Sequence, residues 1–101
     1  MATFDLDHVT AAIHARTSEW DNAGLRWQLV VEHEQVKSAA RVTCEASQLH
    51  AQLVIWTDGD AKVDVTNLSP RLKSVACYTL ATLDDVETCL TAFTQQVTPS
   101  S

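Results

Sequence analysis

The sequence predicts an α+β fold: an N-terminal helix, a five-stranded antiparallel meander sheet and a C-terminal helix. Three observations carry this prediction. Apolar residues recur at helical spacing near both ends of the chain, apolar and polar residues alternate through the middle, and a glycine turn joins two alternating segments. The inward strand faces are apolar and the outward faces largely polar, so both helices are expected on one face of the sheet.

Length and composition indicate one globular domain, residues 1–101, with a frayed tail at 98–101. The hydrophobic content of 46% argues against disorder. No apolar run reaches the roughly 18–20 residues that a membrane span needs, and the first residues lack the pattern of a secretory signal. Three cysteines without C-x-x-C spacing fit a reducing compartment, so a cytoplasmic protein is expected.

The chain is acidic, with thirteen acids, seven bases and a net charge of −6. The phosphate backbone of nucleic acid would repel such a surface, so direct nucleic-acid binding is disfavoured. An acidic domain suits a basic protein partner, because complementary charge speeds encounter and rejects wrong partners. On charge alone, the alternative that mild acidity only keeps the protein soluble is the better explanation.

The first helix is predicted from Phe4 to about Trp20, because apolar residues there follow helical spacing. Asp5 or Thr3 can cap its start, and Gly24 lies close to its end. Its apolar positions are Leu6, Val9, Ile13 and Trp20.

The first hairpin pairs two alternating segments, 25–34 and 39–46, across a turn around Val36-Lys37. Pairing Val31 with Val42 places Glu32 directly across from Arg41, an opposite-charge pair. A short turn at 46–49 then leads into the central hairpin.

The central hairpin, 49–65, is the best-determined element. A three-residue loop, Thr57-Asp58-Gly59, keeps its apolar residues on one face, whereas a two-residue Asp-Gly loop breaks that facing. Gly59 tolerates the positive φ that the longer loop requires. The resulting pairs are Ile55–Ala61 and Leu53–Val63.

The last part of the chain is predicted as a loop at Asn67–Lys73, a short strand at Val75–Leu80 and a helix capped by Thr82. Pro70 ends any strand in the loop. The facing of the short strand stays open between two sets, Val75/Cys77 and Ala76/Tyr78/Leu80. The apolar stripe of the final helix consists of Leu83, Val86, Leu90, Phe93 and Val97.

The sequence carries no recognisable catalytic motif, metal motif or cofactor loop, so an enzyme is not expected. Ordinary structural roles are favoured for the histidines at 8, 14, 33 and 50, and inert packing for the cysteines at 44, 77 and 89. A small enzyme that uses His8, His14 or His50 with an aspartate would need these groups to converge in a pocket. The assigned faces do not predict this convergence.

Trp20 and Trp27 are interpreted as core aromatics, whereas Trp56 points outward by the alternation of its strand. Together with Val54 it forms an apolar pair on an otherwise polar sheet face, which indicates a partner surface. The alternative is that a loop, the edge of the sheet or a second molecule covers Trp56. The candidate binding residues are Trp56 as anchor and Glu45, Asp58, Asp60 and Asp64 as charged partners.

A family resemblance rests on W-T-D-G-D-A-K-V-D-V, residues 56–65, and on the L-D-D-V segment that opens the last helix. This hairpin resembles that of the TriTu-type immunity proteins, small bacterial antitoxins encoded beside the polymorphic toxins of contact-dependent growth inhibition systems. In that family a tryptophan, two variable polar residues, a glycine and an acid precede an alternating strand that closes on an acid and a valine. The matching positions are Trp56, Thr57-Asp58, Gly59, Asp60 and Asp64-Val65.

The resemblance implies a cytoplasmic inhibitor of a cognate toxin domain, a transfer-RNA-cleaving nuclease that works with elongation factor Tu. Such an inhibitor covers the toxin's active site or its substrate-binding surface. The rival hypothesis is a small acidic adaptor, similar to a secretion chaperone, that holds an exported protein in an extended form. The sequence leaves open whether elongation factor Tu joins the complex, and whether the protein is a monomer or a homodimer.

Overall fold

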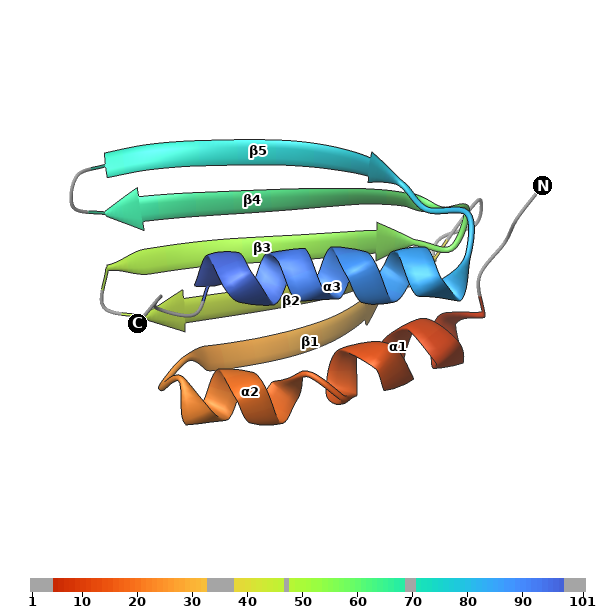
Figure 1. Cartoon of the computed structure of the whole chain (residues 1–101), viewed down its shortest axis with the longest axis horizontal. Coiled ribbons are helices and arrows are strands. Elements are labelled where there is room, and N and C mark those ends of the chain that lie inside the picture. The colour runs from red at the N-terminus through yellow and green to blue at the C-terminus, as the bar shows by residue number, and fades with distance from the viewer. Residues whose placement is uncertain (1–4, 33–37, 47, 69–70, 98–101) are drawn as a thin grey trace.

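The computed structural model describes residues 5–32, 38–46, 48–68 and 71–97 (Figure 1). Five strands form one open antiparallel sheet in the order β1-β2-β3-β4-β5, which confirms the predicted α+β meander. The frayed tail at 98–101, the turn at Val36-Lys37, His33 and Pro70 lie outside the described residues. The elements are α1 (Leu6–His14), α2 (Thr17–Asn22), β1 (Arg26–Glu32), β2 (Ala39–Ala46), β3 (Leu49–Trp56), β4 (Asp60–Leu68), β5 (Arg71–Thr79) and α3 (Leu83–Val97).

The β3–β4 hairpin has the predicted register. Ile55 pairs with Ala61 and Leu53 with Val63. Gly59 has a φ of +102°, and its backbone N–H donates to the Trp56 carbonyl oxygen at 3.1 Å. The three-residue loop is therefore confirmed, and it holds Trp56 at the end of β3.

The predicted register of β1 and β2 is wrong by two residues, because Leu29 rather than Val31 lies opposite Val42. A two-residue shift leaves every side chain on its predicted face, so alternation alone could not separate the two registers. The Arg41 guanidinium still lies 3.2 Å from the Glu32 carboxylate. This ion pair is diagonal, since Glu32 faces Ala39 in the ladder.

The predicted loop at Asn67–Lys73 is wrong, because β4 continues to Leu68 and β5 already begins at Arg71. Within β5, Ala76 and Tyr78 lie opposite the inward residues Val63 and Ala61 of β4. The facing that the sequence left open is therefore the Ala76/Tyr78 set. Cys77 is exposed on the other face, so the prediction that all three cysteines are packed is wrong for this one.

The predicted first helix is wrong in its length, because the chain forms two helices with a break at Ala15 and Arg16. The Arg16 N–H donates to the Ile13 carbonyl at 2.9 Å, an i→i−3 bond that tightens the turn. Asp5 caps α1 as expected, since its carboxylate accepts the Asp7 N–H at 3.0 Å. The apolar spacing survives the break, so Trp20 of α2 is fully buried.

The cap of α3 is confirmed. The Thr82 hydroxyl accepts the Asp85 N–H at 3.2 Å, while the Asp85 carboxylate accepts the N–H groups of Ala81 and Thr82. Leu83 is 47% exposed and does not belong to the buried stripe, contrary to the prediction. Cys89 is buried beside Val86 and Leu90. The buried face of α3 therefore includes Cys89, a position that is not part of the predicted stripe.

One hydrophobic cluster contains buried residues of all three helices and of β2, β3 and β4. At its centre the Trp20 and Phe93 rings meet edge to face with centroids 5.9 Å apart, and the Trp20 indole N–H donates to the Thr94 hydroxyl at 3.1 Å. Trp27, predicted as core, is half-buried at the boundary, where its indole N–H donates to Asp21 at 2.9 Å.

Candidate interaction site

The structure does not bring the five predicted binding residues together. Trp56 is the last residue of β3. Asp58 lies in the turn that follows it, and Asp60 is the first residue of β4. The Asp58 carboxylate accepts the Asp60 N–H at 3.1 Å, which holds this turn. Glu45 lies at the far end: it is six residues along β2 from Ala39, the partner of Trp56, or roughly 20 Å away.

Trp56 is half-buried and lines an open pocket of about 340 Å³. The pocket lies where β3, β4 and β5 reach the same end of the sheet. Its lining combines an indole, a phenol, a thiol, a carboxylate and an ammonium group, which are groups suited to contact with a mixed polar and apolar protein surface. The lining residues are Trp56, Asp60, Ala61, Lys62, Cys77, Tyr78 and Thr79.

The apolar pair predicted on the outward face is smaller than expected. Val54 is buried on that face, with only 5% of its surface exposed, and Ala39, the ladder partner of Trp56, is buried as well. Val54 therefore offers no surface to a partner. Trp56 is left as the predicted apolar contact.

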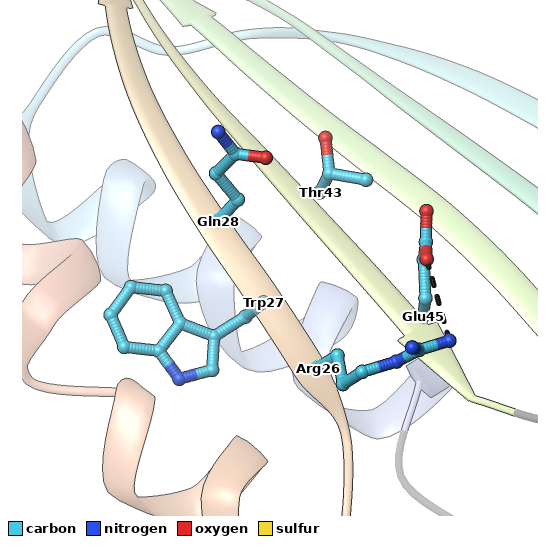
Figure 2. A pocket seen from close by; sticks show the side chains of 5 residues that line it. All are labelled: Arg26, Trp27, Gln28, Thr43 and Glu45. Carbon is cyan, nitrogen blue, oxygen red and sulfur yellow. Dashed lines mark ion pairs between the residues drawn. The ribbon is translucent and has the colours of Figure 1, made fainter.

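Glu45 has partners of its own at the other end of the sheet. Its carboxylate lies 3.8 Å from Arg26 and 3.3 Å from Nδ1 of His50. Arg26 and Glu45 line a shallow cleft of about 160 Å³ together with Trp27, Gln28 and Thr43. Figure 2 shows these five side chains. Asp64 is half-buried between Gln52 and Val75 in the ladder. The structure therefore does not join Glu45 or Asp64 to the Trp56 pocket.

The negative charge of the chain belongs to its helical segments. Residues 25–79, which contain the sheet, carry six acids and six bases and so sum to zero. Residues 5–24 and 80–97 carry seven acids and one base, Arg16, and so hold a net charge equal to the −6 of the whole chain. The segment that contains the sheet thus has no net charge, although the predicted acidic contact lies within it.

Six aspartates nevertheless lie in segments that reach the same end of the longest axis as Trp56: the starts of α1 and α3 and the turn between β3 and β4. Figure 1 shows the starts of α1 and α3 at the same end as the β3–β4 turn. The Leu80 N–H donates to the Gly59 carbonyl at 2.7 Å and so ties the β5–α3 link to that turn. We call this group the acidic end; it consists of Asp5, Asp7, Asp58, Asp60, Asp84 and Asp85.

Four members of the acidic end were not predicted as binding residues. Asp5 and Asp85 cap helices, and Asp7 and Asp84 lie in first turns, where the helix dipole stabilises acids. These local roles explain each residue singly. Their common location follows from the topology, because α1 and α3 both begin at the end where β3 and β5 finish.

The histidines proposed for an enzyme do not share a site. His14 ends α1 and meets the edge of the Trp27 ring on the helix side of the sheet, with centroids 6.4 Å apart. His50 lies beside Glu45 on the outward face. Among the described residues no group of three histidine, cysteine or acidic side chains is placed to hold a metal ion. Within the same part of the chain, no helix combines the length and apolar character needed to cross a membrane.

Comparison with known proteins adds no relative: no protein-family model matches the chain, and no curated protein matches it either.

Proposed function

We propose that this protein is an immunity protein that binds and neutralises a cognate bacterial toxin domain. The observation that carries the proposal is a half-buried tryptophan that lines an open pocket with Asp60, at the end of the sheet where the acidic end lies. Tryptophan is among the residues most enriched at the centres of protein interfaces, because it combines a large apolar area with few rotatable bonds. The surrounding aspartates complement a basic partner surface.

A nuclease toxin is the partner class that fits this surface. An enzyme that binds transfer RNA needs basic residues against the phosphate backbone, and these residues are what an acidic inhibitor can cover. The resemblance of residues 56–65 to the TriTu-type hairpin supports the same class, and with it a toxin that works with elongation factor Tu. The proposal places the protein in the bacterial cytoplasm, where free cysteines stay reduced.

The test is the affinity of the Trp56→Ala variant for the toxin domain, taken from the secreted protein encoded beside this one. We expect binding to weaken by more than about 1–2 kcal/mol, because truncation removes the buried ring of the anchor. Isothermal titration calorimetry measures the affinity, and co-expression with the toxin domain measures rescue of cell growth.

Leu68→Ala is the matched control, because Leu68 is an exposed apolar residue at the end of β4 far from the pocket. This variant should bind and protect like the parent. Equal affinity of a folded Trp56→Ala protein and the parent would exclude the pocket as the binding site. Hydrogen exchange on the bound toxin separates an immunity protein from a chaperone-like adaptor, because only the adaptor keeps its partner extended.

A further inference from the structure

The outer edge of β5 is an open strand edge. Figure 1 shows β5 as the outermost strand, with no described element beside it, whereas α2 runs close to β1 at the opposite edge. The register of β5 with β4 is continuous from Thr79 to Arg71, so no bulge interrupts it. Residues 74–79 contain no charge and no proline, the usual devices that protect an edge from pairing.

The backbone groups that face this edge follow from one hydrogen bond. The Leu80 N–H donates to Gly59 at 2.7 Å in line with the β4–β5 register. Because bonded positions alternate in an antiparallel pair, even-numbered residues of β5 bond to β4 and odd-numbered residues direct their N–H and C=O groups outward. The outward-directed residues are Arg71, Lys73, Val75, Cys77 and Thr79.

Exposed apolar side chains accompany these groups. Leu72 at 60% and Val75 at 51% have the highest exposures among the large hydrophobic residues of the described part of the chain. They lie on opposite faces of the same strand. A partner that only covered one face of the sheet would leave one of the two exposed, whereas a strand added to the edge can contact both.

We propose that β5 pairs antiparallel with β5 of a second copy, about a two-fold axis at Val75, to form a continuous ten-stranded sheet. In this register each odd-numbered residue faces another, so the outward-directed groups of all five odd-numbered residues of the strand are used. Val75 faces Val75 of the second copy, and Lys73 faces Cys77 of the second copy. The inference is independent of toxin binding.

The side chains are complementary in this register. Leu72 faces Tyr78 of the second copy at a position without ladder hydrogen bonds, where side chains come closest, and an aliphatic–aromatic pair of this kind stabilises sheets. Ser74 faces Ala76 of the second copy, two small residues that allow the strands to approach. The two Val75 side chains meet at the axis. Both highly exposed residues of β5 thus gain an apolar partner.

The charge distribution also favours a second copy. β5 contains two bases and no acid, so the acids that give each chain its charge of −6 lie outside the shared strand. The antiparallel arrangement places the two acidic ends at opposite ends of the dimer. Self-repulsion is therefore weakest in this orientation.

The test is sedimentation equilibrium of the full chain over a concentration series in reducing buffer, where we expect a reversible dimer. Val75→Lys should raise the dimer dissociation constant by at least about tenfold, because the pairing would bury two unpaired charges. Val30→Lys is the matched control, since Val30 is an exposed valine of the other edge strand on the same face, and it should leave the dissociation constant unchanged.

Cross-linking tests the register in the Cys77→Ser background. Val75→Cys should form an interchain disulfide on oxidation, because directly opposed bonded positions lie about 5.5 Å apart between Cα atoms. Lys73→Cys, which faces position 77, should not. A chain that is monomeric at every concentration, or that captures only foreign extended segments at β5, overturns the proposal. Equal dissociation constants for Val75→Lys and Val30→Lys, or cross-linking at 73 in place of 75, overturn it as well.

Discussion

Burial divides the three cysteine thiols into two chemical classes. Cys44 and Cys89 are in the core, where desolvation disfavours the thiolate and raises the pKa of Cys44 to about 12 and that of Cys89 to about 11. Cys77 is exposed on the outward face of β5. Position in the fold therefore decides which thiol can react, because the thiolate is the nucleophile.

We expect the folding stability to fall with rising pH above about 9, because thiols of the unfolded chain ionise there while Cys44 and Cys89 stay protonated. The stability that these two groups contribute is complete below the unfolded pKa near 9 and declines until the pH passes the folded values. Each thiol contributes a slope of about 1.4 kcal/mol per pH unit in that window.

Urea unfolding from pH 8 to pH 11 measures this slope, and the double variant Cys44→Ala, Cys89→Ala is the control, because it lacks both groups. Its stability should fall less steeply than that of the parent, whatever its absolute value. Parallel pH profiles for the two proteins would show that these thiols do not titrate differently on folding.

Single residues were predictable where strand alternation decides direction. Strand alternation correctly predicted that Cys44 points inward and Trp56 outward. Gly59 has the positive φ that the three-residue loop between β3 and β4 requires. Alternation does not report what surrounds an outward residue. The burial of Val54 and the ion pairs of Glu45 come from neighbouring strands, so both escaped the prediction.

At the scale of elements, Arg16 joins the N-terminal helices to α3. Its guanidinium donates to the Thr91 hydroxyl at 2.8 Å and to the Glu87 carboxylate at 3.1 Å, while its side chain is only 18% exposed. It also lies 3.9 Å from Glu19 of α2. Because α1 ends at His14, two residues before Arg16, the break between the helices directs this side chain toward α3.

We expect Arg16→Leu to lower the free energy of unfolding by about 1–2 kcal/mol, because it removes charged hydrogen bonds between elements that are far apart in sequence. Glu19→Gln is the control and should change stability by less than about 0.5 kcal/mol, because its ion pair is long and exposed. Urea denaturation measures both variants. Equal losses would show that Arg16 does not hold the helices together.

The elements were predictable in kind, and their errors share a physical cause. The helix break at Ala15 and Arg16 preserves the apolar spacing of Ile13 and Trp20, so local periodicity could not reveal it. The predicted β1–β2 register is wrong by two residues because no glycine turn fixes this register. A glycine turn does fix the β3–β4 register. The sequence predicts a later start for β5 because proline lacks the N–H that a strand ladder needs, whereas β5 begins at Arg71, the residue after Pro70.

At the scale of the whole molecule, charge and apolar surface are separated. The helical segments hold the net charge of −6, residues 25–79 sum to zero, and the most exposed large apolar residues of the described chain, Leu72 and Val75, lie on β5. The acidic end combines residues from three elements, and only the topology brings them together. The sequence predicted Trp56, Asp58 and Asp60 as binding residues at this end. It did not predict Asp84 and Asp85, because they are distant from Trp56 in the sequence.

Hydrogen exchange of this protein, free and bound to the toxin domain that the proposal assigns to it, most directly tests whether the acidic end is the binding surface. We expect slower exchange of backbone amides on binding at 56–62 and 80–87, which hold the Trp56 pocket and the start of α3. The α2–β1 turn and the residues around Glu45, at the far end, should not change. Protection confined to that far end, with none at 56–62, would contradict the proposed site.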